Sequence, residues 1–391
     1  MRTMPEPMGQ STPALGPPPF TLLIVLNGSL ATQGQSVGGG DLVLFKFIRL
    51  SNTQPDILMP KTAQPFVTTR GRLFLTLGNQ RLTVMGILTL FSVRIFQGIW
   101  CALQNRLVYD VALAASPFSV DVIPVWFWKA RRKGAVIYHL LPKREPVNLA
   151  TRVRFGLAAL EQRVMLRVLG RACDFLVAGN EFTRRQLEAR LPGKPIFILP
   201  AGFDAAAIDR IPSPPRDANL GCFVGRLVSQ KGIFDLLKVM ETIRQSQQAF
   251  RLIMAGSGPE QKFLLEEIQR RKLDNVKLAG FVSEEEKTAL LKKSAYFFFP
   301  SYEEGWGIAL AEALYCECRC ICYELPHYRS IFGNFPVYAR LGDADDFVRA
   351  FRQSGAAPHD QKEFMRRYDD PLIARQLVEH LAATIRRTKP S

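Results

Sequence analysis

The chain has 391 residues, which is more than one hydrophobic core usually organises, so two domains are expected. Apolar residues make up 47% of the sequence and charged residues 22%, a composition that excludes a disordered or fibrous chain. The formal net charge of +16 calls for an anionic partner, which could be nucleic acid, a phosphorylated ligand or an acidic membrane surface.

The first residues, 1–18, are rich in proline and lack the basic start and apolar stretch of a secretory signal. We therefore expect a disordered leader, a cytoplasmic protein and free thiols. The most apolar segment runs from Leu82 to Leu103, but Arg94 and Gln97 interrupt it. This interruption favours a buried or surface-lying helix over a membrane span.

Short apolar runs recur through the first half of the chain, separated by longer helix-like stretches. Runs of this length, rich in Val, Ile and aromatic residues, predict parallel strands that helices cover on both faces. The expected strands lie within 21–26, 106–115, 135–141, 174–180 and 195–200. They predict one doubly wound domain over 19–203.

The same rhythm restarts after 213–220, a polar, proline-bearing stretch that is typical of a linker. Strands are expected in GCFVGRL, RLIMAGSG, NVKLAGF and AYFFFPS, with amphipathic helices between them. We expect a second doubly wound domain over 204–370 and a final helix, 371–391, that crosses back to the first domain. In such tandem folds ligands bind at the carboxyl ends of the strands, in the cleft between the domains.

Two of these strand-end loops suit a phosphorylated ligand. GRLVSQKG delivers Arg226 and Lys231 beside a helix start, where a guanidinium fork and a mobile ammonium could clamp phosphate, although both could also be solvated surface residues. AGSGPE places Gly256 and Gly258 at a second strand end. These glycines allow either a close approach of the backbone to a ligand or simply a tight turn.

A third loop, PSYEEGWGIALAEAL, carries two carboxylates. Glu304 is expected in the loop and Glu312 within the following helix, while Gly305 and Gly307 free the backbone at the helix entry. The two carboxylates are too far apart to form a paired acid dyad, so they suit separate hydroxyl groups. Alternatively, they are a helix-start charge and a solvated helix residue. Together the three loops supply groups for both phosphates and hydroxyls, and a sugar nucleotide is a ligand that has both.

The order of GRLVSQKG, AGSGPE, LAGFVSEEE, PSYEEGWGIALAEAL and YELPHYR strongly resembles glycosyltransferase family 4, whose members are retaining enzymes of the GT-B fold. The run from Glu304 to Glu312 is similar to the E-x7-E motif of that family. The resemblance covers about Gly221 to Arg329 and implies two Rossmann-like domains that face each other across a cleft.

The first half resembles the family more loosely. GQSVGGGD, residues 34–41, looks like its N-terminal glycine-rich loop, and LPAGFD resembles its turn at the domain crossing, from which Ala201 and Phe203 depart. His139 stands at an expected strand end. Taken alone it reads as a buried structural histidine, whereas the resemblance implies a hydrogen-bonding group near the donor sugar or the acceptor.

The resemblance also implies roles for the loop residues. Arg226 and Lys231 would neutralise the donor diphosphate without a metal, Glu304 would hold hydroxyls of the donor sugar, and Glu312 would hold the ribose. The other donor-binding positions that it implies are Gly39, Gly40, Gly256, Gly258, Phe281, Val282, Gly305, Trp306 and Gly307. No cofactor is expected, and the donor would be a UDP- or GDP-linked sugar.

The leading functional hypothesis is a retaining glycosyltransferase with a lipid-linked or polysaccharide acceptor. Arginines interleaved with apolar residues over 151–171 suit contact with an anionic membrane, or equally a packing helix with a basic outer face. A sugar-nucleotide epimerase or phosphorylase would share the phosphate clamp. A nucleic-acid-binding protein would share the charge, but no nucleic acid is expected as a partner.

Three further sequence features could suggest a binding or catalytic function, but a structural explanation fits each of them better. Asp343-Ala-Asp345 resembles a metal-binding signature of another glycosyltransferase fold, but a helix cap explains it better. KARRKG, residues 129–134, predicts a solvated helix end or a membrane-facing patch. The cysteine run YCECRCICYELP predicts packing at a helix-to-strand change, with Cys316 near the helix end and a glutamate, Glu317, where the family usually turns through glycine.

Overall fold

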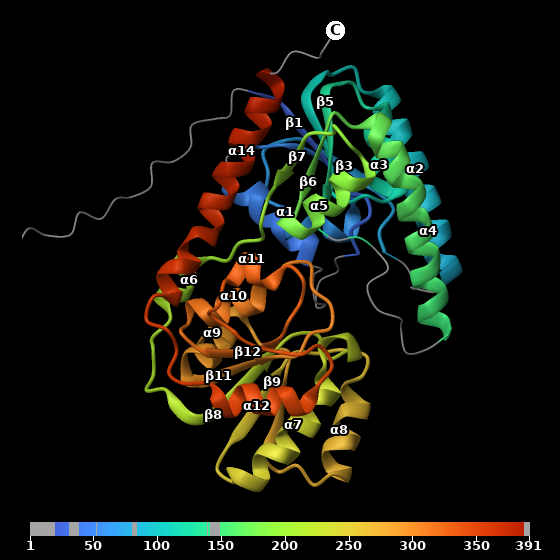
Figure 1. The fold of residues 1–391 in the computed structure, drawn as a ribbon. Coiled ribbons are helices and arrows are strands. Elements are labelled where there is room, and N and C mark those ends of the chain that lie inside the picture. Colours follow the sequence, from blue (N-terminus) through green and yellow to red (C-terminus); the bar gives the residue numbers. More distant parts are fainter. Residues whose placement is uncertain are drawn as a thin grey trace, which may run out of the picture.

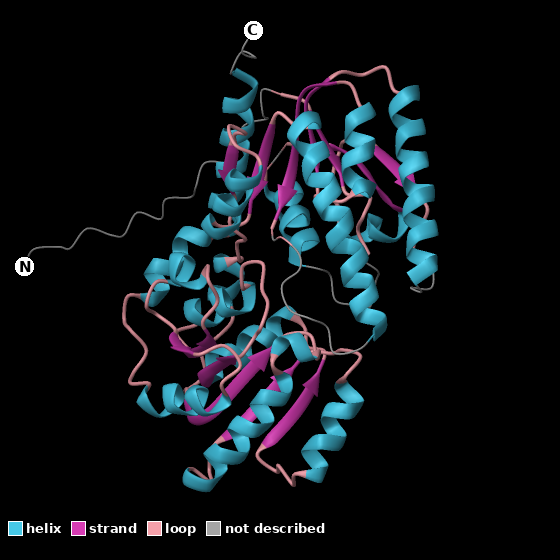
Figure 2. Ribbon diagram, turned by 45° about the vertical axis from the view of Figure 1, so that its right-hand side comes forward, coloured by secondary structure: helices cyan, strands magenta, loops and turns pink. Residues whose placement is uncertain are grey.

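The computed structural model describes residues 20–30, 39–51, 53–79, 84–138, 140 and 149–386. It contains two parallel sheets of seven and six strands, one in each half of the chain, with helices around both (Figure 1). In Figure 2 the strands of each half lie between helices. The predicted leader, residues 1–18, and His139 lie outside the described residues.

The N-terminal sheet has the strand order β3-β2-β1-β4-β5-β6-β7, and all of its pairs are parallel. Helices α1 and α14 cover one face, where their apolar side chains join a core with β1, β2 and β4. Helices α2, α3, α4 and α5 cover the other face. The strands are β1 (Leu22–Val25), β2 (Asp56–Pro60), β3 (Leu73–Thr76), β4 (Tyr109–Ala114), β5 (Ala130–Ile137), β6 (Phe175–Ala178) and β7 (Ile196–Ile198). The helices are α1 (Gly39–Leu50), α2 (Val84–Gln104), α3 (Ser119–Phe127), α4 (Leu149–Ala172), α5 (Glu181–Arg190) and α14 (Asp370–Arg386), with a 3-10 turn, η1, at Lys61–Phe66.

The C-terminal sheet has the order β10-β9-β8-β11-β12-β13. Helices α9, α10, α11 and α13 pack on one face, and α7, α8 and α12 on the other. The strands are β8 (Asp217–Val224), β9 (Arg251–Ala255), β10 (Val276–Gly280), β11 (Ser294–Phe299), β12 (Arg319–Tyr323) and β13 (Val337–Ala339). The helices are α6 (Ala205–Arg210), α7 (Ile233–Ser246), α8 (Gln261–Arg270), α9 (Glu284–Lys293), α10 (Ile308–Tyr315), α11 (Tyr328–Phe332), α12 (Ala344–Gln353) and α13 (Gln361–Met365), with 3-10 turns η2 (Ser229–Lys231) and η3 (Arg366–Tyr368).

The chain passes between the two domains twice, and the two passages lie side by side. Phe203 donates its backbone N–H to Tyr368 and accepts one from Asp370, at 3.1 and 2.9 Å. Lys46 of α1 joins both passages, because its ammonium lies 2.9 Å from the Asp370 carboxylate and 3.1 Å from the Gly202 carbonyl. A partly buried cation of α1 therefore ties the N-terminal domain to the point where the domains connect.

Two predictions about local structure were wrong. Residues 213–220 are not simply a linker, since β8 already begins at Asp217. KARRKG is not a helix end, because all but its first residue lies on β5. The charged start of this strand is accommodated by carboxylates beside it: Arg131 pairs with Asp110 at 3.6 Å and Arg132 with Asp174 at 3.8 Å.

Candidate functional site

The loop that carries Arg226 and Lys231 follows β8 and is fixed against the end of β11. Gly232 has φ +68°, and a Cβ there would lie 2.1 Å from the Pro300 carbonyl oxygen, so only glycine fits this close approach. The backbone N–H of Tyr302 donates to the Gln230 carbonyl at 2.9 Å. These contacts bring the end of the first predicted loop beside the start of the third.

Lys231 and Glu304 meet in this arrangement. The Lys231 ammonium donates to the Glu304 carboxylate, and the two side chains are only 16% and 14% exposed. Arg226 lies on the same loop but is exposed, and no carboxylate in the described part of the chain pairs with its guanidinium. The loop thus offers one cation held by a carboxylate and one cation open to a ligand.

The glycine-rich turn after β9 packs directly on the Arg226 loop. A Cβ on Gly256 would lie 1.9 Å from the Gly225 carbonyl oxygen, and one on Gly258 would lie 2.3 Å from the Leu227 carbonyl oxygen. Ser229 also donates its hydroxyl to Glu260 at 2.5 Å. The close packing of the two loops therefore already explains why both positions are glycine. Contact of Gly256 and Gly258 with a ligand stays a prediction.

The Glu304-Gly-Trp-Gly segment leads into α10 through a conformation that needs glycine. Gly307 has φ +102° and stands at the N-cap of the helix. The Trp306 ring is buried and packs edge-on against Phe332 and Tyr368, with centroids 5.5 and 5.0 Å away. The indole is therefore a core side chain, and any contact of Trp306 with the donor would have to come from its backbone.

Glu312 lies one turn further along α10 and is paired with a residue that the sequence did not single out. The Lys287 ammonium of α9 lies 2.9 Å from the Glu312 carboxylate and 2.6 Å from that of Glu284. Burial of the Lys287 side chain lowers its pKa, but the two carboxylates outweigh this effect and raise it above the ordinary value. Lys287 therefore stays charged. In the sequence it is one lysine in an acidic helix start, and nothing there indicated that it pairs with Glu312.

Two further positions that the resemblance implies for donor binding follow β10. Phe281 follows β10 and is 72% exposed, and Val282 is half-buried beside it. The preceding Gly280 has φ +73°, a conformation that favours glycine, and its carbonyl accepts the Gly256 N–H at 2.7 Å. The turn after β10 is thereby linked to the one after β9.

One hydrogen bond connects this loop group to the N-terminal domain. Asn180, the N-cap of α5, donates its side-chain N–H to the Gly305 carbonyl at 2.8 Å. Gly39 and Gly40 form the first turn of α1, and a Cβ on Gly40 would lie 3.3 Å from the Tyr138 ring. His139, the next residue, is not described. The contact of Asn180 with the C-terminal domain was not predicted, although the sequence shows a polar residue at the end of an expected strand.

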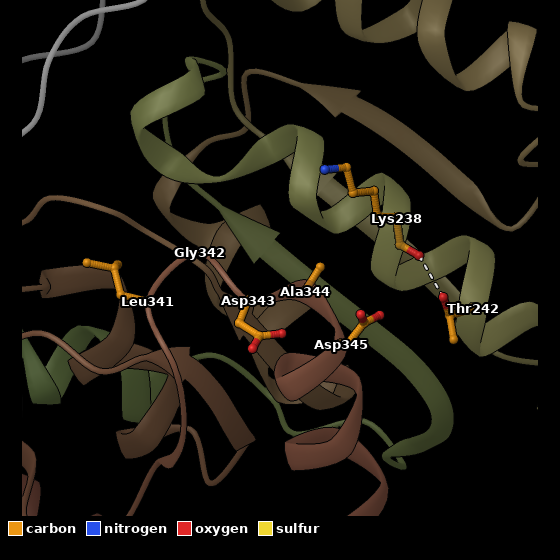
Figure 3. Close-up of a pocket in the computed structure, with 7 residues that line it drawn as sticks. All are labelled: Lys238, Thr242, Leu341, Gly342, Asp343, Ala344 and Asp345. Carbon is orange, nitrogen blue, oxygen red and sulfur yellow. Dashed lines mark hydrogen bonds between the residues drawn. The ribbon is translucent and has the colours of Figure 1, made fainter.

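The Asp343-Ala-Asp345 sequence, which resembles a metal-binding signature, has a structural explanation. The Asp343 carboxylate accepts the Asp346 N–H at the start of α12, as the helix-cap reading predicts. A surface hollow of about 410 Å³ beside it contains none of the predicted site residues (Figure 3). It is lined by Lys238, Thr242, Leu341, Gly342, Asp343, Ala344 and Asp345. Among the described residues no three His, Cys, Asp or Glu side chains are grouped as metal ligands would be.

The cysteine run packs as predicted. Cys316 caps α10, while Cys320 and Cys322 share the face of β12 that lies in the α10 core. Burial raises the pKa of the Cys316 thiol, so it stays neutral and unreactive at neutral pH. Glu317 has φ +61°, and the bonds from Glu317 N–H to the Leu314 carbonyl and from Cys318 N–H to the Ala313 carbonyl complete a Schellman cap. A glutamate thus occupies the left-handed position of that cap.

Residues 204–365 match the family model described as glycosyl transferases group 1. Over 120 residues the chain is 32% identical to the putative teichuronic acid biosynthesis glycosyltransferase TuaC of Bacillus subtilis, covering 31% of this chain and 28% of that protein. It is 24% identical over 198 residues to O-antigen chain mannosyltransferase B of Escherichia coli, covering 47% of this chain and 52% of that protein. The matched segments thus span about half or less of these relatives.

Solved structures extend the likeness to the whole fold. The structure of Anabaena Alr3699/HepE in complex with UDP superposes on this one with a TM-score of 0.69 and 16% sequence identity. The superposition covers 93% of this chain and 100% of that chain. At this identity the likeness shows the fold alone. The protein has the GT-B fold, two Rossmann-like domains that face each other, and residues 204–365 in its C-terminal half match the group 1 model.

Proposed function

We propose that this protein is a retaining glycosyltransferase that moves a sugar from a UDP- or GDP-linked donor to a hydroxyl of a lipid-linked or polysaccharide acceptor. The observation that carries the proposal is the contact between Lys231 and Glu304, delivered from two strand ends within the segment that matches group 1. The names of the relatives, teichuronic acid and O-antigen enzymes, support an acceptor of the cell-envelope polysaccharide type. All seven cysteines are free thiols, which suits a cytoplasmic site of action.

The loop charges suit the departure of a nucleoside diphosphate. Arg226 offers an exposed guanidinium fork, and Lys231 has three ammonium protons, of which Glu304 needs only one. Two cations beside a diphosphate would stabilise the charge that develops on it as the bond to the sugar breaks. We therefore propose that transfer does not require a metal, and that Glu304 both orients Lys231 and accepts a hydroxyl of the donor sugar.

The proposed step retains the configuration of the sugar. The bond from the anomeric carbon to the diphosphate oxygen breaks, and the acceptor oxygen forms its new bond on the same face. Because the acceptor attacks on the face that the diphosphate leaves, no protein nucleophile is needed, and the acceptor proton passes to the departing phosphate oxygen. His139, next to Tyr138 at the end of β5, remains a proposed hydrogen-bonding residue near the donor sugar or the acceptor.

A thermal-shift screen across UDP, GDP, ADP and their sugars tests the proposal first, because a ligand that binds only the native state raises the melting temperature. We expect one nucleoside diphosphate and its sugar to stabilise the protein. The stabilising donor is then incubated alone and with saccharide or lipid-linked acceptors, with and without EDTA. Transfer that persists in EDTA supports the proposal. Isomerised donor without an acceptor would instead indicate an epimerase.

A further inference from the structure

Exposed apolar side chains concentrate in one part of the N-terminal domain. Of the nineteen exposed large hydrophobic side chains among the described residues, twelve lie between Leu88 and Val164. In the same part of the structure, the segment Gly86–Gln104 of α2 is long and apolar enough to cross a membrane by length and composition, and only 22% of the residues in its most apolar window are buried. The outer face of this segment is therefore largely exposed.

Arg94 shows that α2 is a fixed part of the domain. Its guanidinium is fully buried and donates to the carbonyls of Leu77, Asn27 and Ser29 at 2.8, 3.0 and 3.1 Å, and to the Asn79 side chain at 2.7 Å. A helix that left the domain to span a bilayer would carry this cation, stripped of its partners, into hydrocarbon. Helix α2 therefore stays on the domain and shows only its outer face to the surroundings.

The outer face of α2 continues onto the end of α3. Gly98 of α2 lies against Pro124 of α3, since a Cβ on Gly98 would come within 2.9 Å of the proline ring. Figure 1 places α2, α3 and α4 together on the side of the domain away from α14. We call the exposed apolar residues here the α2–α3 surface: Phe96, Trp100, Leu103, Val108, Trp126 and Phe127. The first three lie at helical spacing and are 74%, 59% and 67% exposed.

The part of the chain that forms this surface is rich in basic residues. Between residues 81 and 172 the sequence has fourteen Lys and Arg but only four Asp and Glu. Three of these acids have partners within the domain: Asp110 binds Thr21 and pairs with Arg131, Asp121 is buried, and Glu161 accepts from Ser119. The fourth, Glu145, lies outside the described residues.

We infer that the α2–α3 surface binds the face of an anionic lipid bilayer, with its aromatic and aliphatic side chains in the headgroup region and the exposed Lys129 and Arg131, which follow Phe127, at the lipid phosphates. Trp, Phe and Leu on one face of a helix, flanked by basic groups, are typical of proteins that lie in a membrane interface. A second copy of the chain fits less well, because face-to-face pairing would bring two basic surfaces together. The inference extends the proposed function, since a bilayer would present a lipid-linked acceptor.

Sedimentation of the full-length protein with phosphatidylcholine vesicles, with and without phosphatidylglycerol, tests the inference. We expect binding to the anionic vesicles that falls at least about tenfold in Phe96→Ser/Trp100→Ser, and that also falls in Lys129→Ser/Arg131→Ser and at high salt. The matched control is Phe263→Ser/Leu265→Ser, which removes two exposed apolar side chains from α8 and should bind like the wild type.

Three outcomes would overturn the inference: no sedimentation of the wild-type protein, equal binding of the Phe96/Trp100 variant, or equal binding to neutral vesicles. Self-association that the Phe96/Trp100 substitutions abolish, without vesicle binding, would assign the surface to a second copy instead. Stabilisation by the donor is measured on the same samples. Because this readout does not depend on lipid, failure of the membrane inference is distinguishable from failure of the proposed function.

Discussion

The two domains share one architecture and use their positive charge differently. In the C-terminal domain Lys231 and Lys287 pair with Glu304 and Glu312, the two carboxylates of the segment that follows β11. In the N-terminal domain Arg94 is buried and donates to neutral oxygens, and the stretch from 81 to 172 carries fourteen basic but only four acidic residues. The comparison shows that a parallel α/β sheet fixes where loops and helices lie, while the residues on them decide between a compact ligand site and an extended surface.

The largest effect is expected at the contact between Lys231 and Glu304. Lys231→Ala or Glu304→Ala should lower transfer a hundredfold or more, on the order of the loss seen when a charge-stabilising donor is removed. Both side chains lie at loops outside the hydrophobic cores, so circular dichroism should show an intact fold. Lys238→Ala, an exposed lysine of α7, is the matched control and should stay fully active. Full activity of either site variant would refute the assignment.

The second prediction concerns the N-terminal domain alone. Burial raises the pKa of Asp121 to about 7, although hydrogen bonds from Ser116 and the Gly28 N–H act in the opposite direction. The folded domain therefore holds this proton more tightly than the unfolded chain does. The stability that it contributes is complete below about pH 4 and is lost as the pH rises to about 7, a change of up to about 4 kcal/mol.

Melting temperatures of wild type and Asp121→Asn, measured from pH 4 to pH 7, check this expectation. The asparagine keeps an acceptor for Gly28 and cannot ionise, so the variant should lose less stability over this range than the wild type. Arg94 and Asp41, which lie near Asp121, are unchanged in both proteins. Parallel curves for the two proteins would contradict the burial effect.

The third prediction concerns the buried pair in the C-terminal domain. Lys287→Met leaves the Glu312 carboxylate without its cation and should lower the free energy of unfolding by about 3 kcal/mol. The double variant Lys287→Met/Glu312→Met removes both charges and should recover much of that loss. Urea denaturation of the three proteins measures both effects. If the single and double variants were equally stable, the pair would not act as a unit.

The smallest effect is expected at Glu317. Its left-handed conformation costs a side-chain-bearing residue about 1 kcal/mol, so Glu317→Gly should stabilise the protein by roughly that amount. Glu266→Gly makes the same substitution at an exposed position inside α8 and should destabilise by a similar amount. Thermal melts of the two variants should therefore shift in opposite directions. A shift in the same direction would mean that the cap is not strained.

The fold was largely predictable because hydrophobic runs and glycine turns mark parallel strands. Strands β2, β3 and β13 were missed: β2 ends at Pro60, and β3 and β13 have only four and three residues. KARRKG was predicted to be a helix end or a membrane-facing patch because its charges conceal a strand. The carboxylates of Asp110 and Asp174, which pair with Arg131 and Arg132 of that strand, lie on other segments of the chain. Pairing partners of this kind cannot be read from local pattern.

The site was predictable where a short motif carries it and not where long-range contacts complete it. Glycines and charged residues mark the loops with Lys231 and Glu304 in the sequence, and the structure brings the two side chains together. Lys287 and Asn180 join the group only through folding, since Lys287 lies 25 residues before its partner and Asn180 lies 125 residues before Gly305. Their side chains resemble an ordinary helix residue and an ordinary helix cap.

Binding of a nucleoside diphosphate, measured by calorimetry on wild type, Arg226→Ala and Lys238→Ala, tests the central claim most directly. Arg226 is the exposed cation of the loop, so its removal should cost binding without disturbing a buried contact. We predict that wild type and Lys238→Ala bind the same diphosphate with equal affinity, and that Arg226→Ala binds it at least about tenfold more weakly. Failure of every diphosphate to bind wild type, or equal binding by all three proteins, would contradict the claim that this loop holds the donor.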